Sequence, residues 1–557
     1  MKPIIYQLFP RTFTNYNETR KPNGTKEENG CGKFAEITPK ALKAIYNLGA
    51  THVWYTGVIR HATAENNTPS IVKGKAGSPY AITDYFDVDP DLATEENKRM
   101  EEFEALVRRT HKQGLKVIID FVPNHVAREY KSSCKPKGIS DLGEDDHPEW
   151  AFSPLNNFYY LPGERFEPTF DIGDYNEFPA KVTGNDCFTS HPSRNDWYET
   201  IKLNYGVFYQ GGGEKQFTPV PSTWFKMKDI LNFWAQKGID AFRVDMAEMV
   251  PIEFWQWVIP FTRNRFPEIE FIGEVYNPLA YRDFINAGFN YLYDKVGMYD
   301  YLRGVTTKAW AAEGITRHWQ TIDDIQDHML YFLENHDEQR IASGFFCGRG
   351  SNAEPAMIVA ATLGRNPVLI WAGQEVGEKG MDVEGFSGMD GRTTIFDYWG
   401  VKALQAWTNN GLFDGGKLNS EQKELRTFYQ RLLTIAREHS AIHSGLMYDL
   451  EYAQGEGFDR HEQYAYLRKS DAELLLIVVN FDDKEKEIKV NIPDDAFRYL
   501  QQDPLPQAKA ENLLTGKLLT SISPKGKNIK QITFVPNQPI TIILPAWKGA
   551  IYRITSV

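Results

Sequence analysis

Carboxyl groups follow several short apolar runs of this sequence and could act together on one bond. Asp245 follows AFRV, Glu274 follows EFIG, and Asp337 closes the segment FLENHD. Two carboxyl groups about 5 Å apart can cleave a glycosidic bond with retention, one as the nucleophile and the other as the acid that protonates the leaving oxygen. These three residues are therefore the candidate catalytic groups.

The neighbours of Asp245 and Glu274 suit two different roles. Arg243 lies two positions before Asp245, and residues two apart on a strand face the same way. A guanidinium beside Asp245 would lower the pKa of that carboxyl group and keep it ionised, as a nucleophile requires. Glu274 stands between Gly273 and Val275, and burial among apolar neighbours would favour the protonated form that a general acid needs.

Eight short apolar runs alternate with amphipathic stretches, and these elements must position the candidate groups. The alternation is typical of a (β/α)8 barrel. An open doubly wound sheet is the alternative, but no GxGxxG follows the first run. The runs begin at Ile4, His52, Lys116, Asp240, Glu270, Phe289, Met329 and Pro367.

Helix end signals mark three of the stretches between these runs. A helix is expected after Thr38, which is a cap residue followed by Pro39 in the first turn. A second helix is expected over residues 95–112. A third is expected over residues 222–238, with Ser222 as its cap and Gly238 at its end.

Two departures from a plain barrel divide the chain. Residues 126–221, between the third strand and the next helix, are too many for an ordinary loop and predict a small inserted domain. From residue 441, alternating runs such as QYAYLRK and LLLIVVN predict an all-β C-terminal domain, a sandwich over residues 441–557. Residues 1–125 and 222–440 then form the barrel.

A barrel of this kind gathers the carboxyl ends of its strands at one rim, where its active sites lie. A single carboxylate at a strand end is more often a cap or an ion-pair partner. Three carboxylates together with an arginine and two histidines favour a functional site instead. The residues expected at this rim are Arg243, Asp245, Glu274, Asp337, His125 and His336.

These segments also carry a family resemblance. DFVPNH, GIDAFRVD, FIGEV and FLENHD resemble, in order and spacing, the four signature segments of the α-amylase superfamily of glycoside hydrolases. IYQLFPRTF, GSPYAITDYFDVDPDLAT and the GQE after the eighth strand are similar to that family too, so the resemblance spans residues 1–440. It implies a retaining enzyme that acts on α-glucans by double displacement, with Asp245 as nucleophile and Glu274 as acid/base.

The resemblance also implies roles for four residues around the bond to be cleaved. Asp337 matches the third carboxylate, which binds sugar hydroxyls and strains the ring. His125 and His336 match histidines that hydrogen-bond this sugar, and Tyr80 matches the aromatic ring that stacks on it. Taken alone, the histidines would fit core or capping positions, and Tyr80 would fit simple packing.

A structural calcium is common in this family, but its usual site looks altered here. Asn124 matches one ligand, whereas the best match for an aspartate ligand is the segment IKLN, which places Lys202 there, and Met249 stands where a histidine is usual. A lysine would repel the cation. The loop over residues 14–29 could bind calcium elsewhere or could be a solvated loop. No cofactor is expected for the chemistry itself.

The most direct expectation for the substrate is α-1,4 bonds in starch-like glucans or maltooligosaccharides. Met246, after the nucleophile, differs from the valine that often accompanies α-1,6 specificity. A cyclomaltodextrinase, a neopullulanase-like enzyme, an α-1,6 oligoglucosidase and a transglycosylase share the same machinery and stay open. A non-catalytic sugar-binding protein is disfavoured because all three carboxylates are kept. Glu248 and Met249 depart from the common amylase pattern.

Composition excludes other classes of protein. Acidic residues outnumber basic ones, 74 to 62, without a basic run, which argues against nucleic acid as a partner. No apolar run approaches the length of a membrane span. The four cysteines are widely spaced and are expected to be free thiols. The N-terminus lacks signal-peptide features, so a cytoplasmic enzyme is expected for the chain as given, or a secreted or periplasmic one if a signal was removed.

Overall fold

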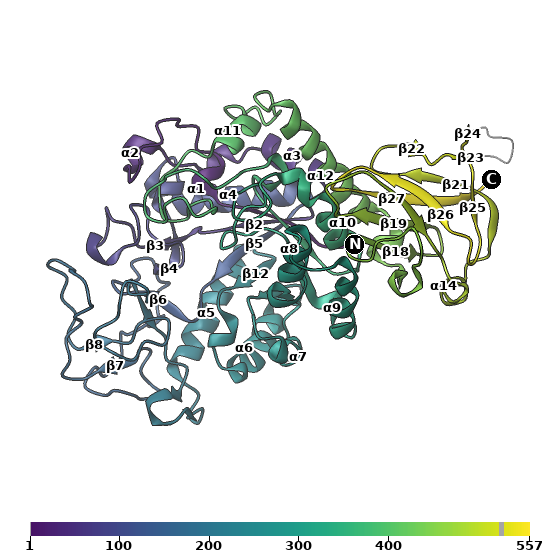
Figure 1. The fold of residues 1–557 in the computed structure, drawn as a ribbon. Coiled ribbons are helices and arrows are strands. Elements are labelled where there is room, and N and C mark those ends of the chain that lie inside the picture. The colour runs from purple at the N-terminus through teal and green to yellow at the C-terminus, as the bar shows by residue number, and fades with distance from the viewer. Residues whose placement is uncertain (1, 523–527) are drawn as a thin grey trace.

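The computed structural model describes residues 2–522 and 528–557, and its centre is a closed barrel of eight parallel strands (Figure 1). All eight predicted runs are barrel strands, which confirms the expected fold. The first strand pairs with both the second and the last, and this closes the barrel. In order along the chain, the strands of the barrel are β1 (Ile4–Leu8), β2 (His52–Tyr55), β5 (Lys116–Phe121), β12 (Ala241–Val244), β13 (Glu270–Gly273), β14 (Tyr291–Tyr293), β15 (Met329–Phe332) and β16 (Val368–Trp371).

Helices follow the strands and surround the barrel. As predicted, the Thr38 side chain caps the first long one by accepting from the Ala41 amide. The predicted Ser222 cap is wrong, because Ser222 is already helical and Pro221 occupies the cap position without a side-chain bond. The helices are α3 (Pro39–Leu48), α4 (Arg99–Lys112), α5 (Ser222–Gln236), α6 (Ile252–Arg265), α7 (Tyr281–Asn286), α8 (Asp300–Thr306), α9 (Ile315–Thr321), α10 (Glu354–Thr362), α11 (Lys402–Thr408) and α12 (Ser420–Glu438).

Strand β12 shows the alternation that places the site. Phe242 and Val244 pack outward into the core between barrel and helices, whereas Ala241 packs inside the barrel with residues of other strands. Arg243 also points inward and is fully buried. Asp240, at the opposite end of the strand, accepts from the Val117 amide and pairs with a histidine at the end of α4. It therefore supports the fold at the face away from the chemistry.

The segment between β5 and α5 is built of short two-stranded ribbons rather than long elements. Its aromatic side chains form a small core of their own, centred on Tyr159 and Phe166. The ribbon nearest the barrel joins His125–Ala127 to Thr200–Lys202. The strands are β6 (His125–Ala127), β7 (Tyr160–Leu161), β8 (Ala180–Lys181), β9 (Thr200–Lys202), β10 (Val207–Phe208) and β11 (Glu214–Lys215).

Antiparallel sheets form the C-terminal part, as predicted, and lie beside the barrel (Figure 1). One buried arginine contributes to the contact between the two parts. Arg468 of β18 donates to the carbonyl oxygens of Leu363, Ala441, Ile442 and Gly445. It thereby satisfies carbonyl groups at the ends of α10 and α13 (Ser440–His443). The strands are β17 (Leu446–Asp449), β18 (Gln463–Lys469), β19 (Leu474–Asn480), β20 (Lys486–Val490), β21 (Leu505–Asn512), β22 (Lys517–Leu518), β25 (Ile532–Phe534), β26 (Ile540–Leu544) and β27 (Lys548–Ser556).

Two of the expectations from composition concern the cysteines and membrane-spanning helices. The four cysteines are free. Among the described residues, no helix combines the length and the apolar character needed to cross a membrane.

Candidate active site

Arg243 joins the two principal candidate carboxyl groups. Strands β12 and β13 are neighbours in register, Val244 beside Gly273, so the residues that follow them emerge side by side. The guanidinium lies 2.7 Å from Asp245 Oδ1 and forms an ion pair of 2.8 Å with Glu274 Oε2. All three side chains are buried. The arrangement brings the candidate nucleophile and the candidate acid together at the carboxyl end of the barrel.

The surroundings of Glu274 differ from the apolar pocket that its sequence neighbours predicted. Phe271 and Val275 point outward into the core around the barrel. The carboxylate instead accepts from the Met246 amide at 2.9 Å and from the Tyr276 hydroxyl, in addition to its ion pair. Met246 has a left-handed backbone, with φ of 43°, which turns its amide toward Glu274. This carboxyl group is therefore held by polar groups at both oxygens.

Arg243 lowers the pKa of Asp245, as expected, but the net shift of this pKa is upward. Burial raises the pKa of Asp245 well above its ordinary value, and the charges of Glu274 and Asp337 raise it further, while Arg243 offsets only part of the shift. One guanidinium among several buried carboxyl groups cannot keep all of them ionised. The upward pKa shifts of Asp245 and Asp337 favour retention of a proton in the cluster, which an acid catalyst needs.

Asp337 lies on the other side of the site and is its most open carboxyl group. Desolvation in the site and the charge of Glu274 raise the pKa of Asp337 to about 7. Its side chain is 43% exposed, so water screens part of this effect. Arg392, from the loop after β16, donates to the Asp337 carbonyl at 2.6 Å and fixes the backbone there.

His336 is neutral, and its proton has a defined place. Burial lowers the pKa of His336 well below its ordinary value. The Gln7 amide nitrogen, which can only donate, lies 2.9 Å from Nδ1, so the proton is on Nε2. From there it faces the Tyr80 hydroxyl at 2.6 Å and Asp337 Oδ2 at 3.0 Å. The Tyr80 ring also stacks on the imidazole, with 5.2 Å between ring centroids.

Sequence reasoning missed several residues of this network. Asp120 accepts from the Trp54 indole at 3.1 Å and from the Tyr80 hydroxyl at 3.2 Å, and it lies 3.5 Å from Arg243. Burial raises the pKa of Asp120 to about 6. The sequence could have indicated Asp120 as a site residue, because it lies near the carboxyl end of β5, much as Asp245 directly follows β12. Gln7 and Tyr276 gave no comparable signal, because their partners lie across the barrel or around a turn.

Among the described residues, His125 forms no hydrogen bond or ion pair with Asp245, Glu274 or Asp337. Burial lowers the pKa of His125 to about 3, and a hydrogen bond to the Tyr80 backbone is its link to the site. Its ring lies 5.2 Å from that of Trp197, which is half-buried. Several aromatic residues of the inserted segment are buried and do not face solvent, namely Phe158, Tyr159, Tyr160, Tyr198 and Tyr205. Trp399, in the loop after β16, is buried as well.

The residues at the usual calcium position do not fit a cation. The Lys202 ammonium donates to Asn124 Oδ1 at 2.8 Å and pairs with Asp186. Lys202 is buried, so a metal ion at Asn124 would meet a fixed positive group. In the loop over residues 14–29, Asn15 and Asn29 are also buried and bind backbone carbonyls after β16, so the solvated-loop reading is wrong for them.

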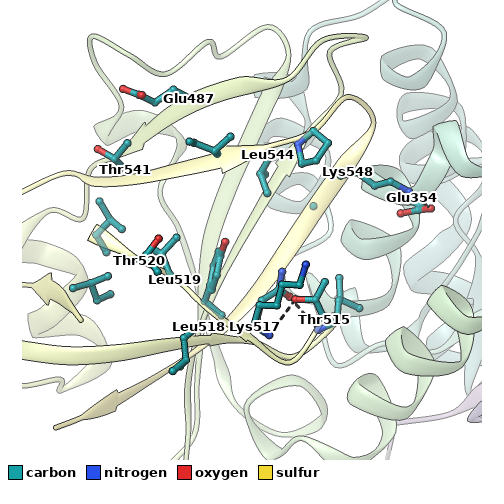
Figure 2. Close-up of a pocket in the computed structure, with 18 of the residues that line it drawn as sticks. Glu354, Glu487, Thr515, Lys517, Leu518, Leu519, Thr520, Thr541, Leu544 and Lys548 are labelled. Carbon is teal, nitrogen blue, oxygen red and sulfur yellow. Dashed lines mark hydrogen bonds and ion pairs between the residues drawn. The ribbon is translucent and has the colours of Figure 1, made fainter. Parts of the chain in front are cut away.

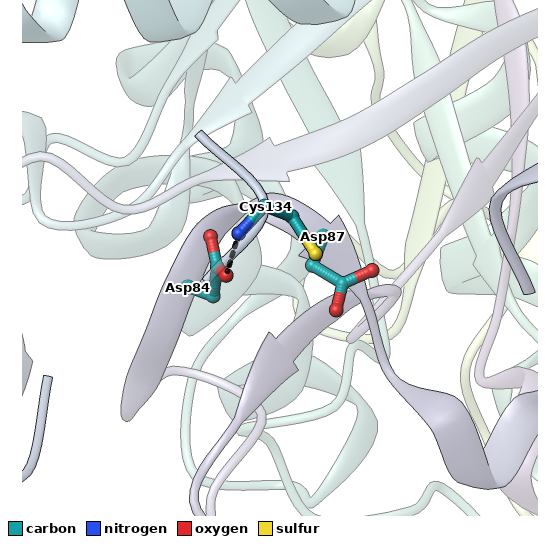
Figure 3. A group of neighbouring side chains, drawn as sticks. All are labelled: Asp84, Asp87 and Cys134. Carbon is teal, nitrogen blue, oxygen red and sulfur yellow. Dashed lines mark hydrogen bonds between the residues drawn. The ribbon is translucent and has the colours of Figure 1, made fainter. Parts of the chain in front are cut away.

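Two other features lie away from this site. Asp84, Asp87 and Cys134 cluster closely (Figure 3), but Arg99 and Arg60 occupy Asp87, and the amides of Ser133 and Cys134 occupy Asp84. These donors leave no role for a metal ion.

A cavity of about 1450 Å³ lies between α12 and the C-terminal strands (Figure 2). Its wall includes the Lys548–Glu354 ion pair but none of the candidate catalytic residues.

A (β/α)8 barrel whose strand ends gather paired carboxyl groups around one guanidinium defines a glycosidase. A family model described as the α-amylase catalytic domain matches residues 7–405. The chain belongs to the α-amylase family.

Individual relatives agree with this assignment at low identity. An α-amylase 2 from Dictyoglomus thermophilum is 22% identical over 502 residues, which are 88% of this chain and 71% of that protein. A neopullulanase 2 from Thermoactinomyces vulgaris is 22% identical over 509 residues, again 88% of this chain and 71% of that protein. The crystal structure of a maltogenic α-amylase from Thermotoga neapolitana shares the fold, with a TM-score of 0.64 and 17% identity over 100% of this chain and 99% of that one.

Proposed function

We propose that this chain is a retaining hydrolase of α-glucosidic bonds, with α-1,4 bonds of starch-like glucans or maltooligosaccharides as its substrate. The observation that carries the proposal is the single guanidinium of Arg243 between Asp245 and Glu274. This arrangement supports Asp245 as the group that attacks a sugar and Glu274 as the group that protonates the leaving oxygen. The names of the relatives, α-amylases and a neopullulanase, support a glucan as substrate.

The reaction proceeds in two displacements. In the first, an Asp245 oxygen attacks the anomeric carbon while the Glu274 proton passes to the glycosidic oxygen, so that bond breaks and a glycosyl ester forms. In the second, Glu274 takes a proton from water, whose oxygen attacks the same carbon and releases Asp245. Asp337 and His336 Nε2 face the same space and would hold hydroxyl groups of the reacting sugar.

The proposed function does not require a calcium ion at Asn124. The Lys202 ammonium supplies the positive charge there and donates to the oxygen that a cation would use. We therefore propose that hydrolysis and the local fold at Asn124 do not depend on calcium.

Two single substitutions test the assignment of roles. We expect Asp245→Asn and Glu274→Gln each to lower kcat on maltoheptaose by at least about a thousandfold, while keeping the fold. Hydrolysis by the wild type should release the α-anomer, which proton NMR detects at early times. Intact hydrolysis in either variant, or release of the β-anomer, would refute the mechanism.

Product profiles test the substrate. Cleavage of maltoheptaose without cleavage of pullulan or cyclodextrin is expected for the α-1,4 assignment. Panose or isopanose from pullulan would instead assign neopullulanase-like activity, and products longer than the substrate would assign transfer.

A further inference from the structure

The acid role of Glu274 requires a proton on one of its two carboxyl oxygens, and the structure distinguishes these oxygens. Oε2 lies 2.8 Å from the Arg243 guanidinium and accepts from the Met246 amide at 2.9 Å. Both of these groups carry hydrogen and offer no lone pair, so a proton on Oε2 would point at another proton. The proton of Glu274 therefore belongs on Oε1.

The partner of Oε1 is the hydroxyl group of Tyr276, two residues further along the chain. Within residues 2–522 and 528–557, no other group forms a hydrogen bond with this oxygen. A hydroxyl group can both donate and accept, unlike a guanidinium or an amide N–H. It can donate to Oε1 when Glu274 is ionised and accept from Oε1 when Glu274 is protonated. Burial and the charge of Glu274 raise the pKa of Tyr276 above its ordinary value, so the hydroxyl group keeps its own proton.

Tyr276 is held in place from two sides. Its ring packs against the apolar cluster inside the barrel. The next residue, Asn277, donates its backbone amide to Glu248 Oε2 at 3.1 Å. Glu248 lies two residues after Met246, whose amide binds the other oxygen of Glu274. The short segment after β12 therefore supports both sides of the acid.

We propose that Tyr276 is a positioning residue that keeps the acid proton of Glu274 on Oε1, an inference that rests on the proposed function. In the first displacement, this proton passes from Oε1 to the glycosidic oxygen, which takes the electron pair of the breaking bond, while Asp245 bonds to the anomeric carbon. In the second, Oε1 takes a proton from the attacking water and the bond to Asp245 breaks. Tyr276 gains and loses no proton in either step, and it orients the carboxyl group in both.

Substrates with different leaving groups separate this role from a structural one. Maltoheptaose needs a proton on its leaving oxygen, whereas α-maltosyl fluoride releases fluoride with little help from an acid. Tyr276→Phe keeps the ring and removes only the hydroxyl group. We expect it to lower kcat/KM on maltoheptaose by about tenfold or more, and on α-maltosyl fluoride by less than about threefold. Tyr281→Phe is the matched control and should leave both values unchanged, because the buried Tyr281 hydroxyl has no hydrogen-bond partner among the described residues.

The pH profile gives a second readout. A hydroxyl group that donates to Oε1 stabilises ionised Glu274 more than protonated Glu274, because a hydrogen bond to a charged group is the stronger one. Tyr276→Phe should therefore move the alkaline limb of the kcat/KM profile on maltoheptaose to higher pH by about one unit. The charged and titratable groups that face the same carboxyl group, namely Arg243, Asp245 and Asp337, are unchanged in this variant.

The ratio of kcat/KM between the two substrates decides, because a loss of folded protein lowers both values equally. An unchanged ratio in Tyr276→Phe, or an unmoved alkaline limb, beside an impaired Glu274→Gln would overturn this inference alone. A Glu274→Gln variant as active on maltoheptaose as the wild type would overturn the proposed function together with it.

Discussion

The guanidinium of Arg243 lies 2.8 Å from Glu274 while it also binds Asp245, so one side chain sets the distance between the two reacting groups. A lysine ammonium is a single point of charge and cannot bridge both carboxyl groups in this way. We expect Arg243→Lys to lower kcat/KM on maltoheptaose by about a hundredfold or more, even where the fold is kept. Steady-state kinetics and circular dichroism measure the two effects. A lysine variant with near-wild-type kcat/KM would contradict the bridging role.

Asp120 makes stability depend on pH. Burial raises the pKa of Asp120 to about 6 in the folded protein. The stability that this residue contributes is thus full below its unfolded pKa, near 4, and is lost as the pH rises through about 6. Between pH 4 and pH 7, the wild type should lose roughly 3 kcal/mol of unfolding free energy relative to Asp120→Asn. Urea unfolding at several pH values measures this difference, and parallel curves for the two proteins would exclude the shift.

Gln7 sets which nitrogen of His336 carries the proton. Gln7→Glu replaces the donor opposite Nδ1 by an acceptor, which draws the proton to Nδ1 or charges the ring. We expect kcat/KM to fall by at least about tenfold, with a changed pH profile. Gln7→Met is the matched control, because it removes the donor without adding an acceptor. Equal pH profiles for the two variants would show that the tautomer is not what Gln7 controls.

Lys202 stabilises the junction of the inserted segment with the barrel. Lys202→Met leaves Asn124 Oδ1 without its donor and should lower the free energy of unfolding by about 1–3 kcal/mol. Lys215→Met, which breaks an exposed pair with Glu253, should cost less than about 1 kcal/mol. Chemical denaturation of both variants, with and without chelator, gives the comparison. A chelator effect confined to the Lys202 variant would indicate that a metal ion can take the place of the ammonium.

The barrel could be predicted because its strands are buried on both faces and read as continuous apolar runs. All eight runs are strands of the barrel. Asp245 and Glu274 follow two strands that are neighbours in the barrel, as expected from strands that are consecutive in the sequence.

Other features depend on contacts that the sequence order does not reveal. Glu274 has apolar neighbours along the chain but polar partners in space, since Arg243 and Met246 reach it from the adjacent strand. The pKa of Asp245 follows from burial and from carboxyl groups on other strands rather than from Arg243 alone.

Arg468 has a consequence for the modular use of this chain. Its guanidinium binds four carbonyl groups at the seam between the barrel and the C-terminal sheets. A barrel cut free after residue 445 would keep those carbonyl groups but lose their donor, at a seam that would then face water. The C-terminal sheets therefore supply the hydrogen-bond donor for these carbonyl groups and cover them from water. An engineered protein in which these sheets are exchanged needs an arginine at the equivalent position.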